Sequence, residues 1–524
     1  MDHLQHECGI AAVYHLESDQ RSPITPLTGP QDVSRLMPRM LLDLQNRGQL
    51  AAGFTTFNPK RDKLLNTHKK IGTVIEAFRL SHEGKRASIQ NEYAGRAAIG
   101  HVRYATCGKN TQDSAQPFER KHGCKWKWFS IAFNGQLANV KDLQSRLKNL
   151  ADYHLIHNND TEVIQHYLSY EHRKESQPDL VEVFRNLSKL FDGAYNIAYL
   201  NAMGDMVIAR DPKGFRPLCY AQDGPLFAAA SESVALQNLG FKNLQDLQPG
   251  EMIIIQNNKV RIERFADPQP ISHCFFEWIY FANVASTLDE RSVYLSRSSL
   301  GKEMARLERQ RKQVILDEDT IVVPVPDTGK AAADAMAHEL NLPSVEGVIR
   351  NRYIGRTFIE GQNRLDRVRM KYTPLRQVLE GKRVILVEDT IVRSTTLNSL
   401  LKHIRDKGKA REIHVRVACP PIKAPCFYGI DMSRVGELFA PKFVAGDDPT
   451  DEEHAAMARE LKADSLYYLP REAISRCIGL PESKLCQACL TSEYPTPKGE
   501  ELFELSLIDR NGKGRIYDQQ TQCG

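Results

Sequence analysis

The sequence has no long apolar run and no marked excess of charge of either sign. None of its 524 residues lies in an uninterrupted apolar stretch approaching the roughly 18 to 20 residues of a membrane-spanning helix. Its first residues, Met-Asp-His-Leu-Gln-His-Glu, lack the basic-then-apolar order of a secretory signal. The 70 Lys and Arg against 65 Asp and Glu leave a formal charge of +5 without a long basic run, which disfavours nucleic-acid binding. We therefore expect a cytoplasmic protein with no membrane and no nucleic-acid partner.

What the sequence does contain is typical of a soluble, folded enzyme. Hydrophobic residues make up 41% and charged residues 26%, unlike a disordered chain. The length exceeds that of one ordinary core, so we expect two large domains. The 11 cysteines are expected to be thiols, metal ligands or nucleophiles, because a reducing compartment disfavours disulfides.

The chain changes its pattern between its two halves. Up to about Asn258, short β-type runs are punctuated by Gly, which predicts stacked antiparallel sheets; the clearest runs are Ala97 to Arg103, Phe129 to Phe133, Ala194 to Leu200 and Met252 to Ile255. From about Asp319, buried strands alternate with polar loops and amphipathic helices, as in a parallel sheet covered by helices. The predicted fold class is thus α+β followed by α/β.

Two strand-loop-helix units stand out in the second half. The first has the strand 384–387, a loop from Glu388 to Thr396, and a helix with apolar residues at i, i+3, i+4 and i+7. The second has the strand 321–325, the loop 327–329 and an Ala-rich helix over 330–340. The tail from Thr496 to Gly524 is polar, and we expect it to be poorly packed.

A candidate nucleophile lies near the start of the chain. Cys8 precedes a Gly and an apolar run, which taken alone is more often a small buried hydrophobic residue. It is followed in order by the segments 44–49, 100–106, 134–135 and 159–162. Together these segments resemble the class II glutamine amidotransferase domain, a four-layer αββα N-terminal-nucleophile hydrolase fold. In that family the cysteine begins the mature chain, and its α-amino group, with a pKa of about 7.7 to 8.0, serves as the base.

The resemblance implies a role for each of these residues. Cys8 would be the nucleophile, Arg103 and Asp160 would hold the α-carboxylate and α-amino groups of glutamine, and Asn134 with the Gly135 amide would form the oxyanion hole. Asn46 and Phe133 depart from the family, which often has His at both positions, and Gln136 stands where Asn is common. Residues 1–7 would be a propeptide that must be removed before Cys8 has a free amine.

The loop after the strand 384–387 is the most specific motif. Two adjacent carboxylates, Glu388 and Asp389, are followed by hydroxyls and backbone N–H groups at a helix start, where an anion is favoured. It resembles the type I phosphoribosyltransferase fingerprint, although Glu388 replaces the usual Asp and Ser394 the usual Gly. The resemblance implies that phosphoribosylpyrophosphate is bound by the two acids and by Thr390, Arg393, Ser394, Thr395 and Thr396.

Two further segments resemble parts of the same site. Asp327, Thr328 and Gly329 match the family's pyrophosphate loop, with Thr328 in place of a metal-associated Ser. Arg352, Tyr353 and Arg356 lie in a stretch that matches the family's lid over pyrophosphate. The resemblance implies that Thr328, Glu388 and Asp389 contact Mg²⁺.

The order of the domains and the residues in their motifs resemble those of the glutamine phosphoribosylpyrophosphate amidotransferase family. Membership would imply transfer of the glutamine amide nitrogen to phosphoribosylpyrophosphate, giving phosphoribosylamine, glutamate and pyrophosphate in the first committed step of purine synthesis. It would also imply an enclosed path for ammonia, purine nucleotides as feedback inhibitors and a homo-oligomer, usually a tetramer. The segment 281–286 departs from the family pattern, which could alter domain coupling.

Four cysteines form a possible metal site. Cys486 and Cys489 make a C-x-x-C pair, whose spacing is compatible with zinc, a redox pair or neither. In the iron-sulfur branch of the family two more ligands lie upstream, and this chain has both, Cys274 and Cys426. The resemblance implies a structural [4Fe-4S] cluster, and zinc stays open on ligand chemistry alone. The remaining cysteines are expected to be free thiols: Cys107, Cys124, Cys219, Cys419, Cys477 and Cys523.

The chain is thus expected to divide into a propeptide (1–7), an amidotransferase domain (8–258), a phosphoribosyltransferase domain (259–470) and a C-terminal segment with cluster ligands and a polar tail (471–524). One alternative is another class II amidotransferase, sugar- or asparagine-forming, which the phosphoribosyl loop argues against. The other is a non-catalytic phosphoribosylpyrophosphate-sensing regulator, which the presence of Cys8, Arg103 and Asp160 argues against.

Overall fold

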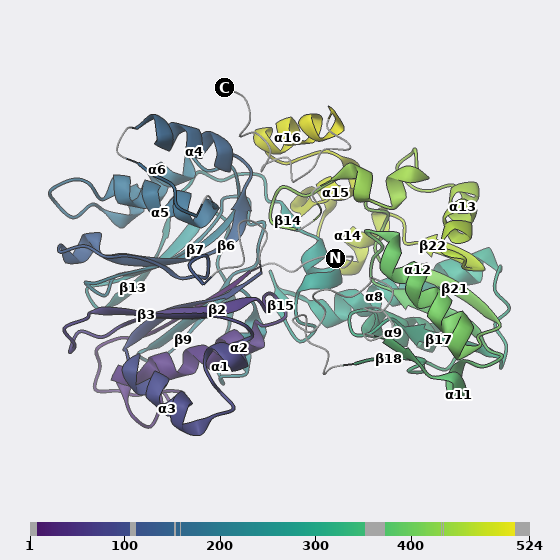
Figure 1. Ribbon diagram of the computed structural model, residues 1–524, viewed down its shortest axis with the longest axis horizontal. Helices are drawn as coiled ribbons and strands as arrows, with labels where there is room; N and C mark the ends of the chain where they lie inside the picture. The colour runs from purple at the N-terminus through teal and green to yellow at the C-terminus, as the bar shows by residue number, and fades with distance from the viewer. Residues whose placement is uncertain are drawn as a thin grey trace.

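The computed structural model describes residues 8–104, 112–150, 153–157, 159–351, 372–430, 432 and 434–508. The expected propeptide and the lid residues Arg352, Tyr353 and Arg356 lie outside the described residues. The chain folds into two lobes that meet along a shared junction (Figure 1).

The first lobe contains two antiparallel sheets stacked face to face, with helices on both outer faces (Figure 1). The seven-stranded sheet has the order β11 (Gln245–Asp246), β9 (Cys219–Asp223), β10 (Leu226–Ala230), β1 (Gly9–His15), β4 (Ala97–Arg103), β2 (Ala51–Phe57), β3 (Leu65–Ile71). The six-stranded sheet has the order β13 (Lys259–Arg264), β12 (Glu251–Gln256), β8 (Met206–Arg210), β7 (Gly193–Asn201), β6 (Phe129–Leu137), β5 (Phe118–Arg120).

Helices complete the four layers. The outer face of the seven-stranded sheet carries α1 (Met37–Asp43), α2 (Val74–Ala77), α3 (Glu83–Glu92) and α7 (Ser233–Gln237). The outer face of the six-stranded sheet carries α4 (Val140–Asn149), α5 (Asp160–Glu171) and α6 (Leu180–Ser188). This arrangement confirms the predicted αββα architecture.

Side-chain alternation explains the layering. In β1, Ala11 and Val13 pack toward the helices, whereas Ile10 and Ala12 pack between the sheets. A strand buried on both faces reads as a continuous apolar run, as the sequence has it. Buried polar residues interrupt this apolar layer at one end, among them His101, Arg103 and Asn134.

The second lobe contains the predicted parallel sheet, in the order β17 (Thr320–Pro324), β20 (Arg383–Glu388), β21 (Glu412–Val417), β22 (Ser465–Tyr468). Two apolar clusters cover its faces: one includes α8 (Val293–Arg311), α9 (Lys330–Leu340) and α14 (Glu472–Ile478), and the other α11 (Arg376–Leu379), α12 (Ser394–His403) and α13 (Asp451–Leu461). The small ribbon β18 (Val348–Arg350) and β19 (Tyr372–Pro374) flanks this sheet.

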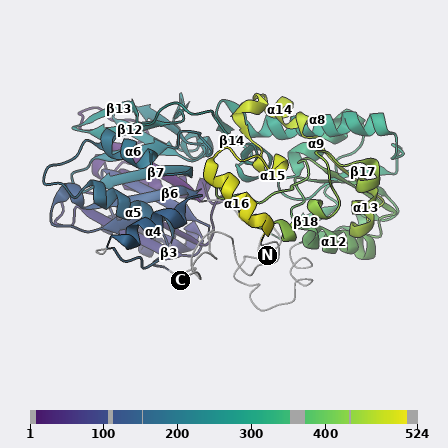
Figure 2. The same cartoon turned by 90° about the horizontal axis from the view of Figure 1, so that it is seen from above.

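The junction is built from the linker and the C-terminal segment. After β13 the chain forms β14 (His273–Cys274), a π-helical turn (Glu277–Phe281) and the hairpin β15 (Thr287–Leu288) and β16 (Arg291–Ser292). β14 pairs in parallel with β23 (Leu485–Cys486), more than 200 residues later in the chain. α15 (Ala488–Thr491) and α16 (Pro497–Ile508) follow, and both views place α16 beside the junction (Figures 1 and 2).

Two details of the prediction are wrong. The boundary after residue 258 cuts the β12–β13 hairpin, because the six-stranded sheet continues to Arg264. The segment from Thr496 is not loosely packed up to Ile508. α16 buries Leu502 and packs Phe503 and Leu505 against an aromatic cluster that contains Tyr428 and Tyr494, and its Lys498 pairs with Asp142 of α4 at 2.9 Å.

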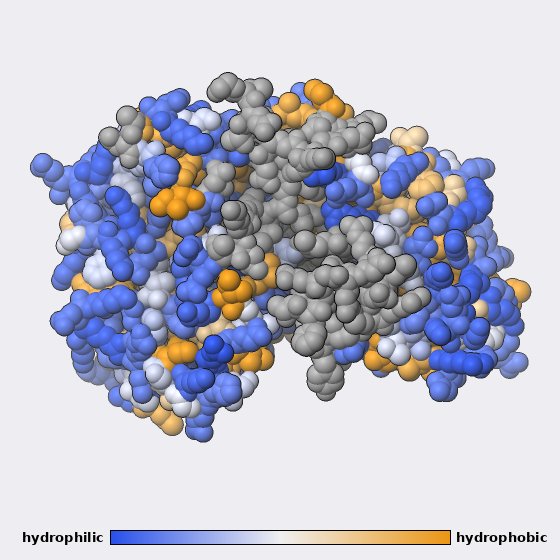
Figure 3. Space-filling view, viewed as in Figure 1, coloured by the Kyte–Doolittle hydropathy of each residue, from blue (hydrophilic) through white to orange (hydrophobic). Residues whose placement is uncertain are grey.

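Most of the surface seen in Figure 3 is hydrophilic on both lobes, with scattered apolar residues. Within the described residues, no helix combines the length and the apolar character needed to cross a bilayer.

Candidate active sites

The predicted nucleophile lies where β1 begins. Gly9 pairs with Val102 of β4, so Cys8, one residue earlier in this register, is opposite Arg103. The Cys8 Sγ–H group donates to the Tyr104 carbonyl at 3.4 Å. Gly48 approaches the backbone of Arg103 so closely that a Cβ atom there would lie 2.6 Å from its carbonyl carbon. Strand pairing and this tight contact fix Arg103 beside Cys8.

Asn134 and Gly135 lie in β6, across the sheet interface from β1. Asn134 is fully buried on the inner face, and its amide is placed 3.2 Å from Ser231 Oγ. Gly135 has φ of 147°, and a Cβ atom there would lie 2.1 Å from the Ala194 carbonyl oxygen. Only glycine fits this position, so the backbone N–H of residue 135 has a conformation that no other residue provides.

Asp160 is the first residue of α5, whose N-cap is Asn159. Its carboxylate accepts a hydrogen bond from the Thr161 N–H at 3.0 Å. Burial raises the pKa of Asp160 to about 6, although backbone hydrogen bonds and the positive charge of Arg103 act in the opposite direction. The effect of Arg103 on this pKa indicates that Arg103 and Asp160, the two residues predicted to bind glutamine, are close enough to interact.

A histidine that was not singled out from the sequence lies on the same inner face. His101 is two residues before Arg103 and is fully buried, and its Nε2 is 3.1 Å from the Phe133 carbonyl. Burial lowers its pKa to about 3, so it is neutral at working pH. It therefore contributes a neutral polar group at this end of the sheets.

The two predicted phosphoribosyl loops meet at the carboxyl edge of the parallel sheet. β17 and β20 are neighbours, so the loops that follow them lie side by side. The Thr328 hydroxyl donates to the Asp389 carboxylate, and the Asp389 N–H donates to Glu388 Oε1 at 3.2 Å. A Cβ atom on Gly329 would lie 2.7 Å from the Val387 carbonyl oxygen, so glycine allows the two loops to approach.

The rest of the predicted loop leads into α12. Ser394 begins this helix, and Thr395 and Thr396 follow in its first turn, where backbone N–H groups are available to an anion. Arg393, just before the helix, forms an ion pair with Glu437. Asp327 of the other loop pairs with Arg350 at 2.6 Å. Thr390 lies half-buried between the acids and the helix.

The four predicted cluster cysteines line one small cavity at the junction. The cavity is formed by residues from both lobes and from the C-terminal segment: Phe215, Arg216, Cys274, Cys426, Tyr428, Ile430, Cys486, Ala488, Cys489 and Tyr494. The Tyr428 N–H points at Cys426 Sγ at 3.4 Å. Burial raises the pKa of Cys486 to about 12 and that of Cys489 well above its ordinary value, and the nearby Cys426 adds to both shifts.

No group of three or more His, Cys, Asp or Glu side chains among the described residues meets closely enough to hold a metal ion. The cysteines that the structure describes form no disulfide with one another.

A buried ion network connects the first lobe to the linker. Arg47 bonds Glu232 at 2.6 Å and Glu277 at 2.5 Å, and all three side chains are at most 1% exposed. Arg216 also pairs with Glu277, at 3.4 Å. Glu232 lies two residues after the end of β10, so this network reaches the same end of the sheets as the candidate glutamine site.

Two of the departures from the family pattern, Asn46 and the segment 281–286, lie at this network. Asn46 Nδ2 donates to Glu232 at 2.8 Å and to the Phe281 carbonyl at 3.0 Å. The Asn283 N–H and the Ser286 hydroxyl donate to the other oxygen of Glu232, each at 2.7 Å. Asn46 and the altered segment 281–286 therefore form one contact, which the sequence did not reveal.

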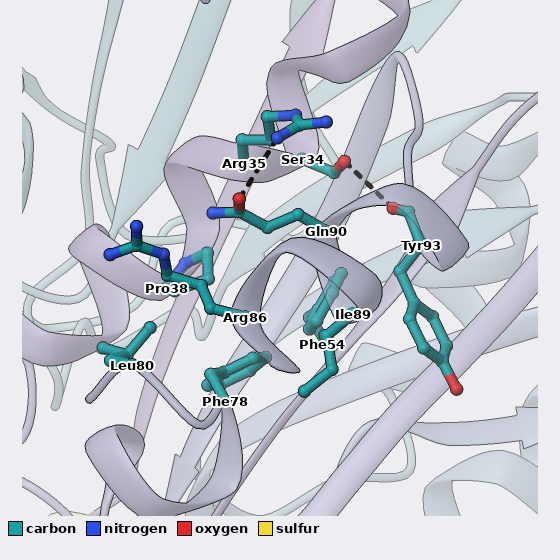
Figure 4. Close-up of a pocket in the computed structure, with 10 residues that line it drawn as sticks. All are labelled: Ser34, Arg35, Pro38, Phe54, Phe78, Leu80, Arg86, Ile89, Gln90 and Tyr93. Atoms are coloured by element: carbon teal, nitrogen blue, oxygen red, sulfur yellow. Dashed lines mark hydrogen bonds between the residues drawn. The ribbon is translucent and has the colours of Figure 1, made fainter. Parts of the chain in front are cut away.

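A separate apolar pocket lies outside both candidate sites. It is formed on the outer face of the seven-stranded sheet, and Phe54, Phe78 and Ile89 are among its lining residues (Figure 4). Arg35 bonds Gln90 across it at 3.1 Å. We assign it no function.

Comparison with known proteins identifies the two lobes. A family profile described as "Glutamine amidotransferase domain" matches residues 101–238, and one described as "Phosphoribosyl transferase domain" matches residues 294–425. The protein is therefore a two-domain chain that combines a glutamine amidotransferase with a phosphoribosyltransferase.

Full-length relatives narrow this class. The amidophosphoribosyltransferase of Methanothermobacter thermautotrophicus is 35% identical over 96% of this chain and 97% of its own, and that of Bacillus subtilis is 33% identical over 94% and 95%. The structure of the B. subtilis glutamine phosphoribosylpyrophosphate amidotransferase with ADP and GMP matches with a TM-score of 0.77 at 32% identity, covering 94% of this chain and 98% of that one. A structure described as the allosteric regulatory enzyme of purine biosynthesis matches with a TM-score of 0.78 at 33% identity, covering 93% and 96%. The chain belongs to the amidophosphoribosyltransferase family.

Proposed function

We propose that this chain transfers the amide nitrogen of glutamine to phosphoribosylpyrophosphate, giving phosphoribosylamine, glutamate and pyrophosphate, as the first committed step of purine synthesis. The observation that carries the proposal is that one chain has both a half-buried cysteine beside a buried arginine and asparagine, and an acid pair at the edge of a parallel sheet. The protein is then an enzyme, a pentosyltransferase with a glutaminase half-reaction.

In the glutaminase half-reaction, Cys8 attacks the amide carbon and its own α-amine takes the thiol proton. Arg103 and Asp160 bind the α-carboxylate and α-ammonium of glutamine, which their opposite charges and mutual proximity support. The Gly135 N–H and the Asn134 amide stabilise the oxyanion, a contribution of several kcal/mol for such donors (about 2.7 to 4 each). This role requires removal of residues 1–7, which N-terminal sequencing or intact mass tests.

In the transferase half-reaction, ammonia displaces pyrophosphate at C1 of the ribose. We propose that Asp327, Thr328 and Gly329 bind the pyrophosphate group, with Arg352, Tyr353 and Arg356 covering it. Glu388 and Asp389 contact the ribose hydroxyls, and the loop residues Thr390, Arg393, Ser394, Thr395 and Thr396 hold the 5-phosphate at the start of α12.

The donor set of this site fits magnesium. Glu388, Asp389 and Thr328 offer oxygen ligands, and Mg²⁺ is commonly held by one or two carboxylates together with substrate phosphates. When bound, the ion would neutralise charge on the departing pyrophosphate. The chain's own contribution is to hold the two carboxylates at the end of β20, where Asp389 accepts a hydrogen bond from Thr328 and its N–H donates to Glu388.

We propose that Cys274, Cys426, Cys486 and Cys489 hold a [4Fe-4S] cluster, as in the iron-sulfur branch of the family. Four thiols line one cavity, and the Tyr428 N–H points at one of them. They do not meet closely enough to share a single metal ion among the described residues, whereas a cubane cluster takes one thiolate on each of its four irons. Burial raises the pKa of the Cys486 and Cys489 thiols, so a bound metal would be needed to keep these two as thiolates. A cluster would join both lobes and the C-terminal segment, so its role would be structural.

Regulation and assembly are carried over from relatives as proposals. The B. subtilis structure contains ADP and GMP, so we propose purine nucleotides as feedback inhibitors of this chain. A homo-oligomer, a tetramer by resemblance, and a cytoplasmic location complete the proposal. An enclosed path would carry ammonia between the sites, since ammonia released into water would be protonated and lost.

The function is tested by measuring glutamine hydrolysis with and without phosphoribosylpyrophosphate, together with pyrophosphate release. We expect pyrophosphate release that depends on glutamine or ammonia. Hydrolysis with no pyrophosphate release would indicate another class II amidotransferase, and neither activity would indicate a regulator without catalysis.

The cluster is tested by metal and sulfide analysis of anaerobically purified protein. We expect about four iron and four sulfide per chain. Cys486→Ser should reduce iron content and soluble yield together, whereas the matched Cys477→Ser, at a cysteine outside the cavity, should change neither. Zinc without iron, or full iron in the Cys486 variant, would overturn the assignment.

A further inference from the structure

The oxyanion asparagine has an unusual buried environment. Asn134 and Ser231 are both fully buried. Asn134 Nδ2 is placed 3.2 Å from Ser231 Oγ, and within the described part of the chain the buried Asn134 Oδ1 has no hydrogen-bond partner. A buried acceptor without a partner is rare in folded proteins and calls for an explanation.

Ser231 is held on its other side by the backbone of β1. Its Oγ accepts the Ile10 N–H at 3.0 Å, and its own N–H donates to the Ile10 carbonyl at 3.0 Å. Ile10 is two residues after Cys8. The serine hydroxyl is therefore fixed between the strand that carries the nucleophile and the side chain that would bind the oxyanion.

Counting protons shows how the amide is oriented. A serine hydroxyl donates one proton. If Asn134 Nδ2 faces the serine, Ser231 Oγ accepts two hydrogen bonds, one from the Ile10 N–H and one from Asn134. The hydroxyl proton of Ser231 then has no acceptor among the described residues. Exchanging the amide oxygen and nitrogen, which are distinguished only by their hydrogen bonds, lets the hydroxyl donate to Oδ1 while still accepting from Ile10. The NH₂ group then occupies the position that has no protein partner.

The end of β10 is rigid enough to maintain this arrangement. The next residue, Glu232, accepts hydrogen bonds from Arg47 at 2.6 Å and from Asn283 and Ser286 at 2.7 Å each. Donors that are fixed before the reaction stabilise a transition state without reorganisation. Ser231 therefore lies on a fixed support rather than on a loop that could reorient.

We propose that Ser231 is a positioning residue for the glutaminase half-reaction. Its hydroxyl donates to Asn134 Oδ1 and thereby directs the Asn134 NH₂ group toward the developing oxyanion. The inference rests on the proposed function, because it requires Asn134 to act in the oxyanion hole. Ser231 itself does not contact the substrate.

The test is a double-mutant cycle on glutamine hydrolysis, with ammonia-dependent synthesis as the measure of folding. Asn134→Ala should lower kcat by about 100- to 1000-fold. Ser231→Ala should lower kcat by about 10-fold with KM for glutamine within about twofold, because the groups proposed to bind glutamine are unchanged. In the Asn134→Ala background, Ser231→Ala should change kcat by less than about twofold, since there is no amide left to orient.

A matched control is available in the same strand as Asn134. Ser130 is also fully buried, and its hydroxyl is 2.7 Å from that of Thr55, away from the site. Ser130→Ala should leave kcat for glutamine within about twofold of the parent. If Ser231→Ala does not fold, as shown by loss of ammonia-dependent synthesis, Ser231→Cys replaces it, since a thiol of similar size is a weaker donor and should lower kcat.

The outcomes separate the two proposals. If Asn134→Ala keeps full glutaminase activity, the oxyanion role of Asn134 is wrong. If Asn134→Ala lowers kcat but the Ser231 variants keep the kcat of the parent or of Ser130→Ala, the positioning role alone is wrong. The same conclusion follows if the effects of Ser231→Ala and Asn134→Ala on kcat are additive in the double variant.

Discussion

The two candidate sites are built in different ways. At the glutamine end, Arg103, Asn134 and Asp160 are at most 8% exposed and lie on or directly beside elements whose register is fixed by pairing and packing. At the phosphoribosyl end, Asp327 lies on a loop and pairs with Arg350 at the end of β18, and their side chains are 60% and 41% exposed. The first site is therefore built from buried groups, whereas the second presents an exposed ion pair, which we expect substrate phosphates to replace. This difference fits a thiol reaction that needs fixed donors and a transfer that closes around a charged substrate.

The sharpest way to separate the sites is to remove the nucleophile. Cys8→Ala should abolish glutamine-dependent synthesis and leave ammonia-dependent synthesis unchanged, because the thiol serves only the first half-reaction. Pyrophosphate release with each nitrogen source measures both rates. Equal loss of the two activities in a folded variant would contradict the separation.

Asp389→Asn should have the reverse effect. Removing its charge should lower synthesis from either nitrogen source by roughly 10- to 100-fold, the effect of losing one charge-assisted hydrogen bond of about 1.5 to 3 kcal/mol. Glutamine hydrolysis should persist, since Cys8 and its partners are unchanged. Retention of ammonia-dependent turnover would show that the acid pair has been misassigned.

Buried and exposed ion pairs should also differ in how much they contribute to the stability of the protein. Arg47→Met removes the partner of two carboxylates, Glu232 and Glu277, which are at most 1% exposed, and breaking such a pair costs about 3–5 kcal/mol. Arg376→Met breaks an exposed helical pair with Glu380, which is worth about 0.3–0.5 kcal/mol. Thermal unfolding should show a clear fall in midpoint for the first variant and almost none for the second. Similar midpoints would mean that the junction network adds nothing to stability.

The smallest expected effect is a change in the slope of log kcat/KM for glutamine plotted against pH. The Cys8 α-amine, with a pKa of about 7.7 to 8.0, should make log kcat/KM for glutamine rise with a slope of one below pH 7.7. Burial raises the pKa of Asp160 to about 6, and glutamine needs this carboxylate ionised, so the slope should increase to two below about pH 6. Asp160→Asn should keep a slope of one throughout. A slope of two that persists in that variant would assign the second titration to another group.

The raised pKa of Asp160 also fixes the sign of its effect on stability. The folded state holds this proton more tightly than the unfolded chain, whose Asp pKa is near its ordinary value. The contribution of Asp160 to stability should therefore decrease as pH rises from about 4 to 6.

Local patterns in the sequence predicted most of the fold. Ala97–Arg103 is strand β4 and Lys330–Leu340 is helix α9, as predicted, because each has a continuous apolar pattern of the right period. The sequence pattern also predicted that the loops of Thr328 and Asp389 lie side by side, because the carboxyl ends of adjacent parallel strands meet at the same edge of the sheet. α16 was missed because its few apolar residues become significant only against the aromatic cluster that they cover.

Contacts between distant segments could not be predicted in this way. Asn46 and Phe281 are 235 residues apart, and nothing local indicates that both lie at Glu232. The position of Ser231 beside Asn134 could not be predicted, because its hydrogen bonds depend on the packing of two sheets. Residue types and their spacing indicate which groups could act in catalysis or binding, and the fold determines which of these groups lie close together.

The central claim is that nitrogen passes from glutamine at Cys8 to the ribose site within one protein. It is tested most directly by supplying glutamine labelled with ¹⁵N in the amide together with unlabelled ammonium and measuring the label in phosphoribosylamine by mass spectrometry. The parent protein should give mostly ¹⁵N-labelled product, and Cys8→Ala should give only unlabelled product at the ammonia-dependent rate. Labelled product from Cys8→Ala, or mostly unlabelled product from the parent protein, would contradict the account.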